Sequence, residues 1–327
     1  MNSIEIKELT PELAADWKRL VLASNNGTLF HDLDFLAYHP PGKFNTCHLM
    51  FRQDGEWLAL LPAAIVVGDD GRKFVTSPFG ASIGGFVLPL GQSVETTLTL
   101  VGRLKQHAAS STLDGVEMRL GPSIYMREPN ENLGFALSAN GFQLVRRWIS
   151  HAVPLVKNPD DTSSRFKRGK QRDIRAGLRR GLNPREAAVD KLAVFYELLT
   201  ATKTRQGAKP THSQEELADL FCRVPGRLRL FLCEKDGREL AGVLVFVLND
   251  VAGFTFYICQ DESNNGTFAT TVLVAHVAQK LGAEGLRWLD LGPSSFDDYS
   301  LNSGLAFFKE GFGAHGFCRD TWRWDRG

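Results

Sequence analysis

The chain has 327 residues, of which 43% are apolar and 23% are charged, and its formal net charge is +1. These values exclude a disordered polyelectrolyte, and the length suits two globular domains of about 150 residues each. The N-terminal sequence has no apolar run behind a basic start, and no segment reaches the roughly 18 consecutive apolar residues of a membrane span. We therefore expect a soluble protein with neither a signal peptide nor a membrane span.

The cysteines predict neither a metal centre nor a disulfide framework, because they are odd in number and form no Cys-x-x-Cys pair. They are Cys47, Cys222, Cys233, Cys259 and Cys318. Thiols stay reduced in the cytoplasm, so we expect a cytoplasmic protein.

The first half begins with a helix signal and continues with a hairpin signal. Thr10 suits an N-cap and Pro11 suits the first helical position, ahead of an apolar face that includes Trp17. Asp54-Gly55 lies between two strand-like runs, which predicts a β-hairpin because both turn positions need φ > 0. A helical stretch follows, and then a short strand ends in Leu120-Gly121-Pro122.

The middle of the chain is strongly basic. Arg165–Arg185 holds nine Arg or Lys residues and a single acid, Asp173, which gives a local charge of +8 in a chain of net charge +1 and leaves −7 for the rest. An anionic partner is the simplest reason for such a concentration of charge. The segment predicts a basic helix over 165–182, with an apolar stripe at Phe166, Ile174, Leu178 and Leu182.

The second half repeats the signals of the first. Asp190 is a candidate N-cap, and Ser213-Gln-Glu-Glu216 is a capping box. Asp236-Gly237 predicts a second hairpin, and a later helical stretch again leads to a strand that ends in Leu291-Gly292-Pro293. Asn140-Gly141-Phe142 and Glu310-Gly311-Phe312 then follow a probable helix in each half.

This recurrence of element order and turn chemistry predicts an internal duplication. The fold class that we expect is α/β (α+β layered), with two tandem domains that are each a mixed sheet with helices on its faces. Periodicity breaks near residues 145–160, so we place the domains at 1–150 and 151–327.

The chain resembles the Fem-type (FemAB-like) branch of the GNAT acyltransferase superfamily, which has a double-GNAT fold. The resemblance rests on RGKQRDIR (168–175) with Gly181, on Arg205, on FTFY (254–257), and most of all on Phe308-Lys309 with Gly313. It implies N-acyl transfer, in which an activated acyl or aminoacyl group moves to an amine. The donor in such enzymes is either aminoacyl-tRNA, as in the building of peptidoglycan cross-bridges, or an acyl-CoA thioester, and no cofactor is bound permanently.

The resemblance implies two catalytic residues. Lys309, set among phenylalanines, would lie near the reaction centre and stabilise either the developing negative charge or the phosphate end of the donor. A surface lysine that extends its ammonium into water is the alternative. Tyr257 lies on a predicted strand, where its hydroxyl would donate to the oxyanion or relay a proton, and a packing role is the alternative.

The donor-binding loop of the resemblance falls on Asn265, Gly266 and Thr267, ahead of a helix whose N-terminus can hold pyrophosphate. Only Gly266 matches the pattern of GNAT enzymes that use coenzyme A, because Ser263 replaces Gln or Arg and Phe268 replaces a small residue. This departure weakens the acyl-CoA hypothesis without excluding it, and a plain capped helix start is the alternative.

Phosphate contacts are expected from the basic segment and from Arg205, which would hold an anionic part of a substrate. On the basic helix, tRNA would engage Arg168, Arg172, Arg175 and Arg179. A solvated helix face is the alternative. Asp290, Asp297 and Asp298 are further candidates for orienting the amine, although Asp290 alternates with Trp288 and so can face the other side of the sheet.

We therefore expect an N-acyltransferase that moves an aminoacyl group from aminoacyl-tRNA to the amine of a small molecule or a cell-envelope precursor. An acyl-CoA-dependent N-acyltransferase that acts on a sugar or metabolite amine is the alternative. A third hypothesis, from another class, is a non-catalytic adaptor that binds a polyanion through the basic helix.

Overall fold

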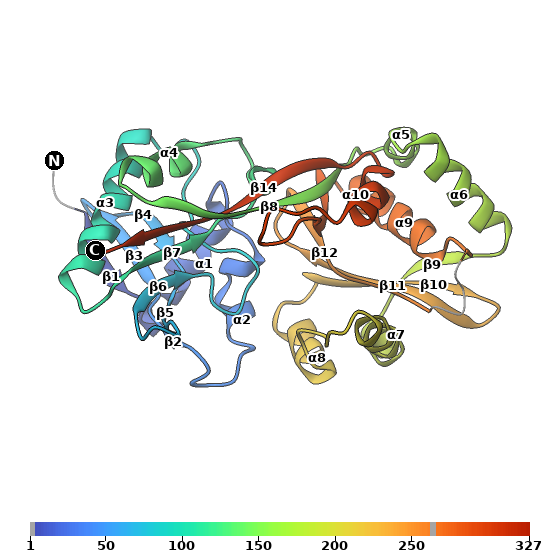
Figure 1. The fold of residues 1–327 in the computed structure, drawn as a ribbon, viewed down its shortest axis with the longest axis horizontal. Helices are drawn as coiled ribbons and strands as arrows, with labels where there is room; N and C mark the ends of the chain where they lie inside the picture. The colour runs from blue at the N-terminus through green and yellow to red at the C-terminus, as the bar shows by residue number, and fades with distance from the viewer. Residues whose placement is uncertain (1–3, 262–265) are drawn as a thin grey trace. The chain divides into compact units, whose positions relative to one another are not determined.

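The computed structural model describes residues 4–261 and 266–327. The chain divides into two compact units, unit 1 with residues 1–148 and 318–327 and unit 2 with residues 149–317 (Figure 1). Each unit combines a mixed sheet with packed helices, which confirms the predicted fold class. In the part of the chain that the structure describes, no helix combines the length and apolarity needed to cross a bilayer.

In residues 4–148 and 318–327, unit 1 consists of a small antiparallel sheet, a larger mixed sheet and four α-helices. Its strands are β1 (Glu5–Glu8), β2 (Asn45–Thr46), β3 (Leu49–Gln53), β4 (Glu56–Leu61), β5 (Ala64–Val67), β6 (Lys73–Ser77), β7 (Gly115–Arg119) and the first part of β8 (Gln143–Pro154). Its helices are α1 (Ala14–Ala23), α2 (Leu33–Leu36), α3 (Val94–Ser110) and α4 (Asn132–Ala139). The strand orders are β1-β3-β4 and β2-β5-β6-β7, and β6 and β7 are parallel.

Unit 2 has one sheet with helices on both faces. Its strands are β9 (Asn183–Ala187), β10 (Leu228–Lys235), β11 (Arg238–Val247), β12 (Ala252–Gln260), β13 (Trp288–Pro293) and the first part of β14 (His315–Asp325). Its helices are α5 (Pro159–Ser164), α6 (Arg168–Arg179), α7 (Leu192–Arg205), α8 (Gln214–Arg223), α9 (Ala269–Ala283) and α10 (Ser303–Glu310). The strand order is β13-β12-β11-β10-β9, with β12 and β13 parallel. Figure 1 shows α7 and α8 on one face of this sheet and α9 on the other.

The strands β8 and β14 exchange between the units. The end of β8 pairs antiparallel with β13 in unit 2, from Trp288↔Pro154 onward, and the end of β14 pairs antiparallel with β7 in unit 1, from Thr321↔Arg119 onward. The last ten residues therefore belong to unit 1. The predicted boundary at residue 150 does not include this exchange. Strand pairing between segments far apart in the sequence leaves no local signal.

The internal duplication is confirmed by the repetition of two features. In both hairpins the Asp and the Gly have positive φ: 49° and 90° for Asp54 and Gly55, 54° and 78° for Asp236 and Gly237. In both units a helix connects two parallel strands, β6-α3-β7 in unit 1 and β12-α9-β13 in unit 2.

The basic helix is shorter than predicted. It is α6, Arg168–Arg179, and Asn158 caps the separate short helix α5 that precedes it. Phe166 and Leu182 are buried beside the ends of α6, whereas Leu178 is 48% exposed, so the predicted apolar stripe is wrong at that position.

The two predicted caps of unit 2 differ in outcome. Asp190 is not the N-cap of α7, because a short 3-10 turn at Val189–Lys191 makes Lys191 the residue that precedes the helix. The capping box of α8 is confirmed, since Ser213 accepts from the backbone of Glu216 and Glu216 accepts from the backbone of Ser213.

Candidate active site

Lys309 lies on α10 with its ammonium group inside unit 2. The side chain is 2% exposed, and Nζ donates hydrogen bonds to the carbonyl oxygens of Gly292 (2.7 Å) and Pro293 (2.8 Å). These carbonyls belong to the Leu-Gly-Pro turn at the end of β13. Burial of an ammonium group is costly unless acceptors replace its water, so the turn is the local reason why Lys309 can be buried rather than reach into solvent.

A buried histidine accompanies the lysine. His151 Nδ1 lies 3.0 Å from the hydroxyl of Ser294, and Nε2 lies 3.9 Å from the carboxylate of Glu310, the residue after Lys309. Desolvation, followed by repulsion from the Lys309 ammonium, lowers the pKa of His151 below its ordinary value of 6.5. The lowered pKa favours the neutral form of the imidazole beside Lys309.

A cavity of about 470 Å³ lies at the C-terminal end of β12, beyond the residues that pair with β13. The two strands pair from Ala252↔Trp288 only as far as Phe254↔Asp290, although β12 continues to Gln260. The cavity is lined by the end of β12, the C-terminal end of α7, the N-terminal end of α9 and Phe308. Since Phe308 directly precedes Lys309, α10 presents one residue to the cavity and buries the next.

The N-terminal end of α9 forms one wall of the cavity. Gly266 and Thr267, both predicted to bind the donor, lie there, and Phe268 is the N-cap with φ 70°. Asn265, the third predicted residue, lies outside the described residues. The first backbone N–H groups of a helix have no acceptor within it, and the helix dipole favours negative charge at this end. This wall is therefore suited to an anionic part of a ligand.

Cationic side chains lie around the same wall. Arg205 lines the cavity and donates from Nη2 to Thr202 Oγ1 (3.4 Å) and to the Gln260 carbonyl (3.3 Å). From the neighbouring α6, Lys170 donates to Thr271 Oγ1 (3.4 Å), and desolvation lowers its pKa from the ordinary value. Arg180, just after α6, donates to the Gly266 carbonyl (3.3 Å).

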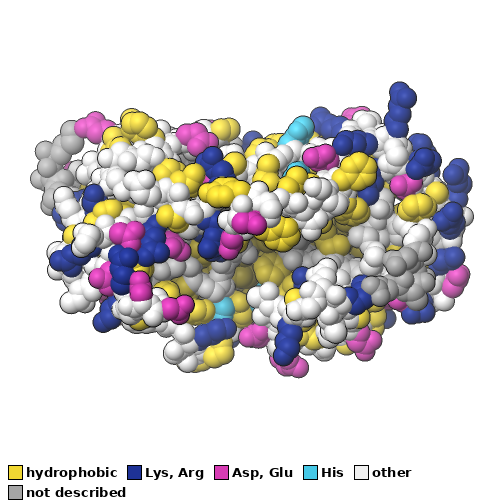
Figure 2. Space-filling model, in the orientation of Figure 1, with side chains coloured by type: hydrophobic (Ala, Val, Ile, Leu, Met, Phe, Trp, Pro, Cys, Tyr) yellow, Lys and Arg dark blue, Asp and Glu magenta, His cyan; other side chains and the backbone are white. Residues whose placement is uncertain are grey.

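Lys170 and Arg180 therefore lie closer to the cavity than the four arginines that the sequence indicated. Those four, Arg168, Arg172, Arg175 and Arg179, are all exposed on α6 and line no part of the cavity. Figure 2 shows dark-blue side chains gathered at the end of unit 2 where α6 lies. Lys170 and Arg180 both belong to the basic segment that the sequence analysis identifies. The spacing of its charged residues does not indicate which of them face α9.

Tyr257 does not line the cavity. It is buried, and its hydroxyl accepts a hydrogen bond from the backbone N–H of His212 (3.1 Å). Desolvation raises the pKa of Tyr257 above its ordinary value. In this position the hydroxyl anchors the loop between α7 and α8 to β12.

Unit 1 provides an internal comparison for the lysine. Aligning the Asn140-Gly141-Phe142 and Glu310-Gly311-Phe312 segments places Ala139 where unit 2 has Lys309. Only unit 2 therefore carries an ammonium group at this position. Among the described residues, no group of three or more His, Cys, Asp or Glu side chains is arranged to hold a metal ion.

Residues 164–300 match the model of the acetyltransferase (GNAT) domain. Among solved structures, FemX superimposes with a TM-score of 0.75 at 14% identity, over 98% of this chain and 97% of that chain. The C-terminal domain of a putative lysylphosphatidylglycerol synthetase from Agrobacterium fabrum gives a TM-score of 0.61 at 12% identity, over 95% and 92%. A tandem GNAT protein from the clavulanic acid biosynthesis pathway gives 0.55 at 10% identity, over 99% of both chains. No curated protein matches the sequence.

Proposed function

We propose that this chain, which has the Fem-like double-GNAT fold, is an N-acyltransferase that moves an aminoacyl group from aminoacyl-tRNA to an amine acceptor. The observation that carries the proposal is the buried ammonium of Lys309, which is held by the turn at the end of β13 and directly follows Phe308, a residue that lines the cavity at the N-terminus of α9. The resemblance to Fem-type enzymes supports an acceptor amine on a cell-envelope precursor or a small molecule. The five free cysteines fit a cytoplasmic enzyme.

The reaction forms an amide bond and breaks the ester bond between the aminoacyl group and the tRNA. The acceptor nitrogen attacks the acyl carbonyl and loses a proton, and the leaving ribose oxygen takes up a proton. Negative charge develops on the carbonyl oxygen in between. In the low dielectric around Lys309 a fixed positive charge stabilises such an oxyanion more strongly than it would in water.

The surroundings of the cavity favour tRNA as the donor. The exposed arginines of α6 can contact a phosphate backbone without reading its sequence, and Lys170, Arg180 and Arg205 place further donors at the α9 wall. We propose that Gly266 and Thr267, together with Asn265, contact the acyl-bearing end of the donor.

An acyl-CoA donor is the second candidate. It is favoured by the position of the cavity, because the N-terminus of α9 together with Arg205 also suits a pyrophosphate group. The bulky Phe268 at the N-cap argues against close approach of phosphate to the backbone.

A ligand-dependent melting experiment followed by an assay separates these functions. Charged tRNA should raise the melting temperature more than acetyl-CoA or long-chain acyl-CoA, because a ligand that binds only the folded protein stabilises it. Treatment with RNase should then abolish transfer to an amine. Release of free thiol from acyl-CoA would instead establish the second candidate, and salt-sensitive RNA binding without turnover would establish a polyanion-binding adaptor.

A further inference from the structure

Asp290 is a fully buried carboxylate that lies directly before the turn holding Lys309. The side chain is 0% exposed on β13. Its Oδ1 accepts a hydrogen bond from the hydroxyl of Ser150 (2.7 Å) and a second one from the backbone N–H of Gly292 (2.7 Å). An unpaired carboxylate would not be stable in this position, so these contacts are part of what keeps it there.

The carboxylate is connected to Lys309 through a single turn. Gly292, whose N–H binds Asp290, has φ +84°, a left-handed conformation that disfavours any residue with a Cβ. The carbonyl oxygens of Gly292 and Pro293 then accept from Nζ of Lys309. Asp290 therefore fixes the N–H side of the turn whose carbonyl side binds the ammonium.

Asp290 also lies where the strand pairing of β13 changes on both sides. It is the last residue of β13 that pairs with β12, opposite Phe254, and the hydroxyl of Thr255 donates to its backbone carbonyl (3.2 Å). On the other side, the pairing of β13 with β8 changes register between Asp290 and Pro293. The turn therefore begins where the pairing of β13 with β12 ends and its pairing with β8 shifts.

Unit 1 lacks all three parts of this arrangement. When the two Leu-Gly-Pro segments are aligned, Arg119 takes the place of Asp290 and Gly121 takes the place of Gly292, and Gly121 has no positive φ. Ala139 takes the place of Lys309. The carboxylate, the left-handed glycine and the ammonium are therefore present together in one copy of the duplicated fold and absent together in the other.

We propose that Asp290 is a positioning residue for the transferase reaction: through Gly292 it sets the direction of the carbonyls that hold the Lys309 ammonium. This rests on the proposed function, since Lys309 is the group that would face the developing oxyanion. The competing role is that of a simple counter-charge, in which the carboxylate only balances the buried ammonium and its hydrogen bond to Gly292 is incidental.

Two substitutions at Asp290 distinguish positioning from charge balance. Asp290→Asn removes the charge and keeps an oxygen that can accept from Ser150 and Gly292, whereas Asp290→Ala removes both. We expect Asp290→Asn to keep kcat within about fivefold, and Asp290→Ala to lower kcat by about 30-fold or more with KM nearly unchanged, a loss typical of a misplaced catalytic group. An equal, large loss of kcat in both variants would overturn the proposal in favour of charge balance.

A second pair of variants keeps the proposal testable if Asp290→Ala does not fold. Gly292→Ala strains the turn through its φ alone, since its nearest neighbour to an added Cβ is a Phe254 ring carbon at 3.5 Å. Gly285→Ala is the matched control, with φ +103° and open space around it. Both should lower the melting temperature to a similar extent, but only Gly292→Ala should lower kcat. Equal kcat values in the two variants would contradict the positioning role.

A spectroscopic measurement separates this proposal from the proposed function. In lysine-labelled protein, the side-chain resonance that disappears in Lys309→Met belongs to Lys309, and we expect Asp290→Ala but not Asp290→Asn to shift it toward the position of exposed lysines. An unmoved resonance in Asp290→Ala would contradict the proposal even if the protein transferred no acyl group. A shifted resonance in a protein without transfer would support the positioning contact and reject the proposed function alone.

Discussion

The hydroxyl of Tyr257 lies 2.9 Å from Nδ1 of His212 and accepts the backbone N–H of the same residue at 3.1 Å. The carbonyl of His212 in turn accepts from the hydroxyl of Tyr196 on α7 at 3.2 Å. The loop between α7 and α8 is thereby attached to the sheet and to a helix through one residue.

We expect Tyr257→Phe to affect stability more than catalysis. The change leaves the buried backbone N–H of His212 without its acceptor, which should cost about 1–2 kcal/mol of unfolding free energy, while kcat should stay within about threefold. Thermal unfolding and steady-state kinetics measure the two effects. Tyr196→Phe is the control, with a smaller loss of stability because its side chain is less buried. A 100-fold fall in kcat at an unchanged melting temperature would assign Tyr257 the oxyanion-stabilising role that the family resemblance implies.

Local signals in the sequence identified the elements that position the site. Each Asp-Gly pair predicts its hairpin because the turn needs two residues that tolerate positive φ. In the structure, both residues of each pair have a positive φ. The duplication likewise follows from repeated turn motifs, and Phe308-Lys309 drew attention to α10. These features are encoded within a few residues of one another, so they are visible without a structure.

Contacts between distant residues were not visible in the same way. The exchange of β8 and β14, the hydrogen bond from Ser150 to Asp290 across 140 positions, and the contact between His212 and Tyr257 depend on tertiary packing. Alternation along the strand suggested that Asp290 could face away from the site. The carboxylate of Asp290 accepts from the backbone N–H of Gly292, and the carbonyl of the same glycine accepts from Lys309.

Removal of the ammonium group is the direct test of the candidate active site. We expect Lys309→Met to lower kcat by about 100-fold or more, the usual cost of losing a group that stabilises an oxyanion. The change also removes the donor of two carbonyls, that of the buried Gly292 and that of the partly buried Pro293, so the melting temperature should fall as well. Lys235→Met, on the exposed β10–β11 hairpin, is the control and should retain full activity. Transfer at the wild-type rate by folded Lys309→Met protein would contradict the assignment.

The exposed arginines of α6 should determine the salt dependence of donor binding. We expect Arg175→Gln combined with Arg179→Gln to weaken binding of charged tRNA and to lower the slope of log Kd against log salt by about one to two, since each phosphate contact releases roughly one counterion. Binding measured between low and physiological salt gives this slope. Lys18→Gln combined with Lys43→Gln removes the same charge from unit 1 and should leave the slope unchanged. Equal slopes for both pairs would show that α6 is only a solvated face.

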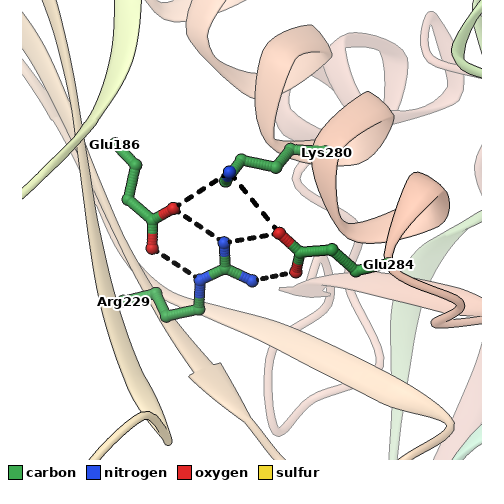
Figure 3. Close-up of polar contacts among 4 residues, drawn as sticks. All are labelled: Glu186, Arg229, Lys280 and Glu284. Atoms are coloured by element: carbon green, nitrogen blue, oxygen red, sulfur yellow. Dashed lines mark hydrogen bonds and ion pairs between the residues drawn. The ribbon is translucent and has the colours of Figure 1, made fainter.

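A network of four charged side chains fixes the C-terminal half of α9 to the edge of the unit 2 sheet (Figure 3). Arg229 on β10 donates to Glu186 on β9 at 2.7 and 2.8 Å and to Glu284, just after α9, at 2.9 Å. Lys280 on α9 lies 3.3 Å from Glu186 and 3.5 Å from Glu284. The same helix forms the wall of the cavity with its other end, so this network contributes to the placement of the cavity.

Arg229→Met should reveal the pH dependence of this network. Hydrogen bonds from Arg229 are the main cause that lowers the pKa values of Glu186 and Glu284 below their ordinary value of 4.5. A lowered pKa in the folded state stabilises the protein above that ordinary value, and this contribution disappears as the pH falls through the lowered folded-state values. We therefore expect Arg229→Met to lower the free energy of unfolding by about 1–2 kcal/mol at neutral pH. This loss is smaller than for a fully buried ion pair because the carboxylates are partly exposed. The difference from wild type should shrink below about pH 4.5 in urea unfolding.

Arg223→Met, which breaks an exposed pair with Asp219 on α8, is the control and should cost less than about 0.5 kcal/mol at any pH. A loss that stayed constant from neutral to acidic pH would show that Arg229 stabilises the sheet through its packed aliphatic chain rather than through its ion pairs.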